Sequence, residues 1–122
     1  MINASLVAME INNCLPAMEI PRETENYEGF YHLISMSGDV AEAHLNYIIR
    51  DHDALLFEAK KATLCHIEKI MNEKWGAGTV QLTITDQYRN MAEIIKKCMF
   101  LIENAVKACK NTNIPPLILP IR

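Results

Sequence analysis

Two short segments with alternating apolar and polar side chains constrain the fold of this chain more than any other feature. They span residues 30–37 and 43–50. Strict alternation is typical of β-strands, because successive side chains point to opposite faces of a sheet. The sequence Ser-Gly-Asp at 37–39 lies between them and favours a turn. The two segments therefore predict a β-hairpin.

An unbroken alternation also predicts which side chains share a face of the hairpin. The first strand should carry an apolar face that invites edge pairing, formed by Phe30, His32, Ile34 and Met36. In the second strand the predicted core face consists of Leu45, Tyr47 and Ile49. The opposite face carries His44, Asn46, Ile48 and Arg50.

Helices and one more strand surround the hairpin. Apolar residues recur every three or four positions and predict helices over 2–14, 53–74 and 91–110, the last with a break near Met99. Asp51 or Asp53 is a suitable cap for the middle helix. The run TVQLTITD, at 79–86, alternates again and predicts a third strand. Three prolines in the last residues, 111–122, predict an extended tail.

The order of these elements predicts an α+β fold. It corresponds to a ferredoxin-like two-layer sandwich, an antiparallel sheet with helices on one face, that lacks its first strand. The absent strand would lie between residues 43–50 and 79–86, and its loss leaves backbone groups unpaired. The gap can close by direct pairing of these strands, by insertion of the tail, or by a strand from another chain. We expect self-association, because the apolar faces of both strands need covering.

Composition excludes several classes of protein. Lys and Arg total 12 against 15 Asp and Glu, so the net charge is −3 and no basic patch for nucleic acid is expected. No apolar run reaches the roughly 20 residues of a membrane span. The start of the chain lacks the basic region of a signal peptide. We therefore expect a cytoplasmic protein that binds neither nucleic acid nor membrane.

The cysteines and histidines do not form a metal-binding pattern. The four cysteines lie far apart, and none belongs to a Cys-x-x-Cys pair. Without a secretion signal we expect reduced, mostly buried thiols. Cys65 and His66 are the only Cys/His neighbours, whereas zinc sites use repeated ligand pairs at short spacings. The sequence predicts no metal site and no cofactor in this chain.

One long segment carries a family resemblance. YEGFYHLISMSGDVAEAHLNYIIRDHD, followed by FEAKK, closely resembles the lid of peptidase T, a zinc-dependent bacterial tripeptide aminopeptidase; the resemblance continues through VQLTITDQYRNM to LPIR. It implies that residues 1–90 are a lid and dimerisation domain without its first strand. Residues 91–122 would be a helix and short strand returning to the catalytic domain. The family's zinc ligands have no counterparts here, so the resemblance implies a non-catalytic fragment.

The resemblance also implies two substrate-binding residues. Arg50 is similar to a family arginine that holds the C-terminal carboxylate of the substrate, and a guanidinium matches a carboxylate with two parallel donors. The alternative for Arg50 is a weak surface ion pair with Asp51 or Asp53. Asn3 is similar to an asparagine near the substrate, and its alternative is a helix N-cap. We expect His32 and His44 to be ordinary sheet-surface histidines.

Two functions of different classes follow. The leading hypothesis is a lid and dimerisation fragment of a peptidase T-like enzyme, whose tripeptide substrate is bound only in the parent enzyme. The competing hypothesis is a free-standing ferredoxin-like domain that holds a small carboxylate or peptide with Arg50, His44 and Asn46. The sequence contains no recognisable acid/base pair, and independent catalysis is the weakest hypothesis.

Overall fold

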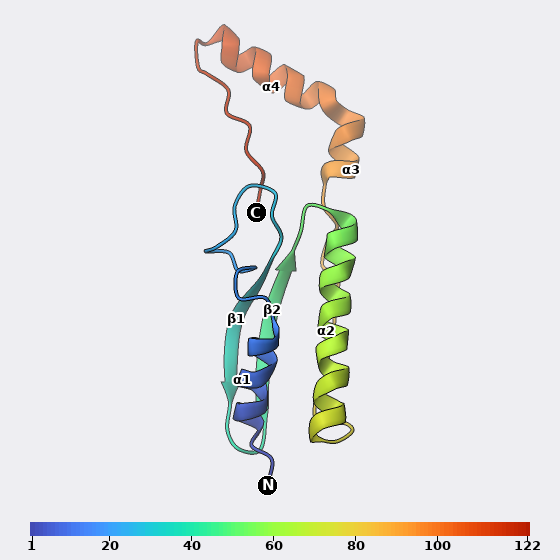
Figure 1. Ribbon diagram of the computed structural model, residues 1–122. Helices are drawn as coiled ribbons and strands as arrows, with labels where there is room; N and C mark the ends of the chain where they lie inside the picture. The colour runs from blue at the N-terminus through green and yellow to red at the C-terminus, as the bar shows by residue number, and fades with distance from the viewer. The chain divides into compact units, whose positions relative to one another are not determined.

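The computed structural model describes all residues from 1 to 122 and shows an α+β chain with a two-stranded antiparallel sheet. Two compact units form, which we call the hairpin unit (Met1–Ile84 with Arg122) and the helical unit (Thr85–Ile121). The predicted division at residue 90 refers to the domains of a larger enzyme and stays a prediction. Figure 1 shows the elements in order, which are α1 (Ala4–Cys14), β1 (Phe30–Gly38), β2 (Ala43–Arg50), α2 (Ala54–Trp75), α3 (Ala92–Ile95), the 3₁₀ turn η1 (Lys96–Cys98) and α4 (Met99–Asn111).

The predicted hairpin is confirmed. β1 and β2 pair antiparallel, from Phe30 opposite Arg50 to Gly38 opposite Ala43. At the turn, Oδ1 of Asp39 accepts hydrogen bonds from the backbone N–H groups of Ala41, at 2.7 Å, and Glu42, at 3.2 Å. These bonds favour the ionised carboxylate and hold the pKa of Asp39 below its usual value. The ionised Asp39 side chain therefore stabilises the turn.

The predicted faces of β1 are wrong beyond its middle. A β-bulge interrupts the register between Leu33 and Ser35, so that Met36 lies opposite Leu45. A bulge inserts one residue into one strand and exchanges the faces of all residues after it. Met36 therefore shares the face of Tyr31 and not that of Phe30. The continuous apolar edge expected from Phe30, Ile34 and Met36 does not form.

Both long helices of the hairpin unit contact the same face of the sheet. The hydroxyl of Tyr47 donates to Oδ1 of Asn12 in α1, at 2.8 Å. The hydroxyl of Tyr31, on the same face, donates to the carbonyl of Lys60 in α2, at 3.4 Å. The other face of the hairpin carries no helix of this unit. The buried core consists of Val7, Ala8, Phe30, Tyr31, Leu64, Ile67 and Met71.

The predicted third strand does not form, and residues 79–86 belong to no sheet. Their backbone groups are bonded to side chains of α2 instead. Asn72 accepts from the N–H of Val80 and donates to its carbonyl, both at 2.9 Å. Glu68 accepts from the N–H of Leu82 at 2.8 Å. Without the strand expected beside it, this segment takes its hydrogen bonds from the helix that precedes it.

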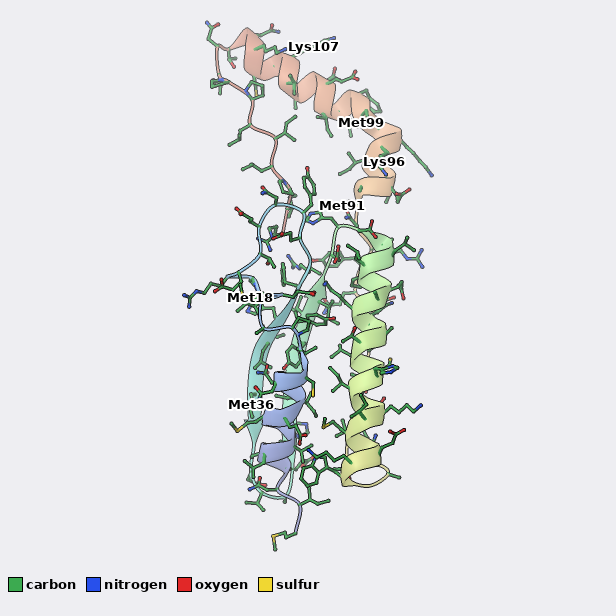
Figure 2. The ribbon with its side chains drawn as sticks, in the orientation of Figure 1. Met18, Met36, Met91, Lys96, Met99 and Lys107 are labelled. Atoms are coloured by element: carbon green, nitrogen blue, oxygen red, sulfur yellow. The ribbon has the colours of Figure 1, made fainter.

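The helical unit has secondary structure but no core. The break expected near Met99 is confirmed, because the 3₁₀ turn Lys96–Cys98 separates α3 from α4. None of these three elements contains a buried residue, and Figure 2 labels Met99 and Lys107 among the side chains of α4. The short strand expected in the tail is not formed. No helix of the chain has the length and apolar composition that a membrane crossing requires.

Candidate functional site

Arg50 ends β2 on the face of the hairpin opposite to the helices. It pairs across the hairpin with Phe30, whereas Tyr31 and Ile49 form the next pair and face α2. Side chains of cross-strand partners lie on the same face, so the Arg50 side chain starts beside the Phe30 ring. The side chain of Arg50 is partly exposed. The predicted carboxylate ligand is not tested by this geometry, which places a partly exposed arginine at a strand end.

A second arginine lies at the same end of the hairpin. The guanidinium carbon of Arg122 lies 5.2 Å from the centroid of the Phe30 ring. Its terminal nitrogens donate to the backbone carbonyl and the hydroxyl of Thr24, and its Nε is buried without a hydrogen-bond partner. The Phe30 ring thus has one arginine stacked on it and a second opposite it in the sheet. The sequence did not predict this contact, because it joins residues far apart in the chain.

Directly after Arg50 comes an aspartate with a buried side chain, in a cluster that we call the Asp51 network (Asp51, Lys60 and Glu19). The side chain of Asp51 is only 2% exposed, and its Oδ2 lies 3.7 Å from Nζ of Lys60. Lys60 also bonds directly to Glu19. Burial lowers the pKa of Lys60, but the hydrogen bond and charge of Glu19, with smaller contributions from Tyr31 and Asp51, outweigh this and raise it above its usual value. The pattern of the sequence did not single out this network.

The alternative prediction for Arg50 was a surface ion pair with Asp51 or Asp53. Asp51 pairs with Lys60. Asp53 is the N-cap of α2, as predicted for one of these two aspartates, and its Oδ1 accepts from the N–H groups of Leu55, at 2.8 Å, and Leu56, at 3.0 Å. Both carboxylates therefore have structural contacts of their own.

Asn3 is an N-cap in the structure. Its Oδ1 accepts from the N–H of Leu6, at 3.3 Å, at the start of α1. The next residue, Ala4, donates to the carbonyl of Val40 in the hairpin turn, so Asn3 lies at the turn end of the hairpin and Arg50 at the other end (Figure 1). The eight residues of β2 separate these ends by roughly 24 Å. An extended tripeptide spans at most about 11 Å, so the two residues of one chain do not reach one tripeptide.

Two polar residues of β2 that share the face of Arg50 have partners on the sheet surface. Nδ2 of Asn46 donates to Oγ of Ser35 at 2.8 Å. Nε2 of His44 lies 3.3 Å from a carboxylate oxygen of Glu42, and both side chains are exposed. His32 is exposed on β1. These contacts agree with the expected role of both histidines as surface residues.

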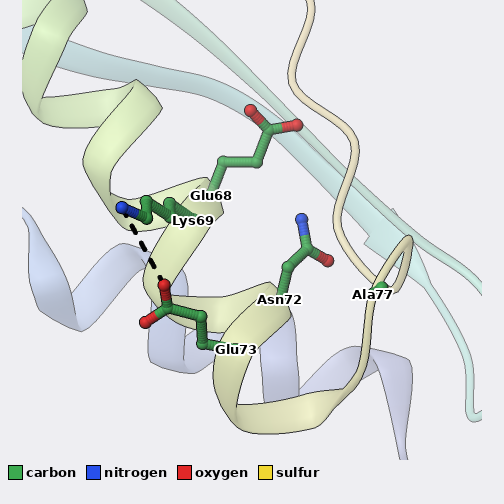
Figure 3. A pocket seen from close by; sticks show the side chains of 5 residues that line it. All are labelled: Glu68, Lys69, Asn72, Glu73 and Ala77. Atoms are coloured by element: carbon green, nitrogen blue, oxygen red, sulfur yellow. Dashed lines mark ion pairs between the residues drawn. The ribbon is translucent and has the colours of Figure 1, made fainter.

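Two open hollows lie away from Arg50. One, of about 450 Å³, is lined by Glu68, Lys69, Asn72, Glu73 and Ala77 (Figure 3). Its polar side chains are already occupied, because Asn72 and Glu68 bind the following backbone and Lys69 pairs with Glu73 at 4.0 Å. The other, of about 460 Å³, lies at the hairpin turn and is lined by Met1, Ile2, Asp39, Val40 and Ala41. Neither contains a predicted site residue.

The thiols and possible metal ligands are scattered in the structure. All four cysteines are unpaired. The expectation that they are mostly buried is wrong, since Cys14 and Cys65 are exposed and the other two partly so. These residues lie on helix surfaces, where apolar spacing alone does not decide burial. No three His, Cys, Asp or Glu side chains are grouped so as to hold a metal ion.

Comparison with known proteins gives a consistent result over the whole chain. All 122 residues align, at 44% identity, with peptidase T of Caldanaerobacter subterraneus subsp. tengcongensis. The identity is 42% to peptidase T of Clostridium novyi and 49% to peptidase T of Bacillus thuringiensis. The chain spans 30% of the length of each of these curated relatives. No protein-family model matches the chain.

Proposed function

Because this chain is homologous over its whole length to a segment of peptidase T, we propose that it is the non-catalytic lid and dimerisation part of a peptidase T-like zinc tripeptide aminopeptidase. The observation that carries this proposal is the 42–49% identity over all 122 residues. The zinc ion, the catalytic residues and most of the substrate site would belong to the remainder of such an enzyme. This chain would contribute a surface that closes over substrate.

The role we assign to Arg50 is to bind the C-terminal carboxylate of a tripeptide. Its place on the helix-free face supports this, because a lid must present its ligand-binding groups on a face that its own helices leave uncovered. A guanidinium binds a carboxylate through two parallel hydrogen bonds, a geometry that lysine cannot reproduce. We place Arg50 alone in this site, and the substrate role of Asn3 stays a prediction.

We further propose that the ferredoxin-like sheet is completed by a strand between β2 and residues 79–86. Two observations support this topology. Both α1 and α2 contact the same face of the hairpin. The segment after α2 follows the helix back, and its N–H groups at Val80 and Leu82 are bonded by α2 side chains. In the isolated chain we expect a second copy to supply the strand, which gives self-association.

Light scattering coupled to size exclusion, at several concentrations, tests self-association of the isolated chain. We expect the mass to rise above 13.9 kDa with concentration. A compact monomer at every concentration, with cooperative thermal unfolding, would contradict association and favour pairing within the chain.

Segment replacement tests the lid assignment. The 122-residue chain is substituted for the matching segment of the Bacillus thuringiensis relative. We expect the chimera to fold and to cleave free-acid tripeptides in the presence of zinc. A folded chimera that retains zinc but has no activity would contradict the lid assignment. Tight binding of free-acid peptides by the isolated chain would instead favour the free-standing carboxylate-binding domain.

Substitution of Arg50 in the active chimera tests the carboxylate contact. Arg50→Lys should lower kcat/KM for free-acid tripeptides, since disturbing a charged pair at a binding site costs about 2–5 kcal/mol and lysine recovers only part of it. With C-terminally amidated tripeptides, kcat/KM of the unmodified chimera and of the Arg50→Lys chimera should differ much less. Arg22→Lys is the matched control, because the Arg22 side chain is 89% exposed. Equal losses on both substrates would make Arg50 a structural residue.

A further inference from the structure

The Asp51 network is unusual because its central carboxylate is buried and incompletely bonded. Oδ1 of Asp51 accepts from the N–H of Asp53 at 3.0 Å. Oδ2 has no hydrogen-bond partner, and its nearest cation, Nζ of Lys60, lies 3.7 Å away. Burying a charge is costly, and a well-packed apolar pair often stabilises a fold as well or better. Stability alone therefore does not account for a carboxylate at this position.

A glycine makes room for this carboxylate. A Cβ atom on Gly29 would lie 2.0 Å from Oδ2 of Asp51 and 2.6 Å from Cε of Lys60. Both distances are far below contact distance, so any larger residue would displace the network. Gly29 adjoins Phe30, the strand partner of Arg50, and Asp51 adjoins Arg50 itself. Gly29 and Asp51 thus flank the last residue pair of the hairpin.

The network joins three parts of the hairpin unit at one point. Asp51 directly follows β2, Lys60 comes from α2, and Glu19 comes from the loop after α1. That loop is also fixed to β1, since the N–H of Tyr31 donates to the carbonyl of Glu19 at 2.8 Å. Nζ of Lys60 lies 5.1 Å from the centroid of the Tyr31 ring. Rotation of the chain at Asp51 would move its Oδ2 away from Nζ of Lys60 and break the hydrogen bond from the N–H of Asp53.

We propose that the Asp51 network is a positioning device for Arg50. Adjacent residues of an extended chain point to opposite faces, so holding Asp51 on the helix side holds Arg50 on the helix-free side. A carboxylate-binding guanidinium gains affinity when its direction is set before the ligand arrives. Asp51, Lys60, Glu19 and Gly29 are therefore positioning residues that do not touch the ligand. This inference deepens the proposed function of Arg50 and rests on it.

The direct test uses the 122-residue chain without any substrate. NMR relaxation of the Nε–Hε group reports the order of each arginine side chain. We expect Arg50 to be well ordered in the unmodified chain, and Arg22, whose side chain is 89% exposed, serves as the reference. Asp51→Asn should bring the order of Arg50 close to that of Arg22 while the hairpin amides keep their chemical shifts. Unchanged order of Arg50 in a folded Asp51→Asn chain would overturn the proposal.

A double variant separates positioning from stability. Asp51→Asn with Lys60→Met removes both buried charges and keeps the side-chain volumes similar, so it should fold even where Asp51→Asn alone does not. We expect the order of Arg50 to remain low in this variant. A stable double variant with an ordered Arg50 would show that the charges do not set its direction. Lys60→Arg, which keeps the charge, should retain more order than Lys60→Met.

The chimera supplies a functional readout that can fail independently. There, Asp51→Asn should raise KM for free-acid tripeptides by roughly tenfold, with a smaller change in kcat and little change for amidated substrates. If the order of Arg50 falls but KM for the two substrate classes changes equally, the network positions Arg50 and the carboxylate role is wrong. If the order of Arg50 is unaffected, the positioning role is wrong whatever the activity.

Discussion

The hairpin unit and the helical unit contain comparable helices but differ in what surrounds them. α2 buries Leu64, Ile67 and Met71 against the hairpin and α1, whereas α4 buries none of its residues. Phe100 and Leu101 of α4 are more than half exposed. Helical spacing of apolar residues thus predicts both helices equally well, but only one of them has a core. Isolated helices of this length are marginal in water, so we expect α4 to be much less stable than α2.

Hydrogen exchange should show the largest difference between the two units. Local opening ranges from almost no cost in unpacked segments to the full free energy of unfolding in a core. We expect amides in the middle of α2 to exchange about 100-fold or more slowly than those of α4, on the basis of that range. Equal protection in both helices would show that α4 has a packing partner in solution, such as a second copy of the chain.

Truncating one apolar side chain in each unit sharpens the comparison. Met71 is 2% exposed, so Met71→Ala should lower the free energy of unfolding by about 2–5 kcal/mol. Phe100 is 57% exposed, and Phe100→Ala should change it by less than about 0.5 kcal/mol. Urea unfolding followed by circular dichroism measures both. A large loss for Phe100→Ala would mean that the helical unit has a core in solution.

Asn72 tests where the hairpin unit ends. Its side chain bonds both backbone groups of Val80, so Asn72→Ala leaves a donor and an acceptor without partners, at a cost of about 1–3 kcal/mol. We expect faster proteolysis between residues 79 and 84 with little change in the hairpin. Lys69→Ala, on the outer surface of the same helix, is the control. Unchanged cleavage would mean that this segment is held by something other than α2.

The smallest effect concerns pH. The pKa of Lys60 is raised in the folded chain, so its stabilisation is complete below the unfolded value of about 10.4 and is lost as the pH rises through the folded value. Burial raises the pKa values of Tyr31 and Tyr47, which act in the same direction because the unfolded tyrosines ionise first. We expect the hairpin unit to lose stability above about pH 10. In denaturant titrations at several pH values, the free energy of unfolding of Lys60→Met should fall less steeply with rising pH.

The sequence by itself determined the local elements. The bounds of both hairpin strands, of α1 and of α2 agree with the periodicity within about two residues. The break before Met99 and the N-cap at Asp53 were also predictable. All of these depend on interactions between residues close together in the chain. The likeness to peptidase T was visible in the same way, from the order of the residues alone.

Tertiary structure decided the features that depend on distant partners. Residues 79–86 have the alternation of a strand, but a strand needs a neighbour, and α2 side chains supply the hydrogen bonds instead. The bulge in β1 moved Met36 to the other face, which no count of alternating residues reveals. The side chain of Asp51, one of two acids that could form a surface pair with Arg50, is buried, because Lys60 and Gly29 lie beside it only in the folded chain.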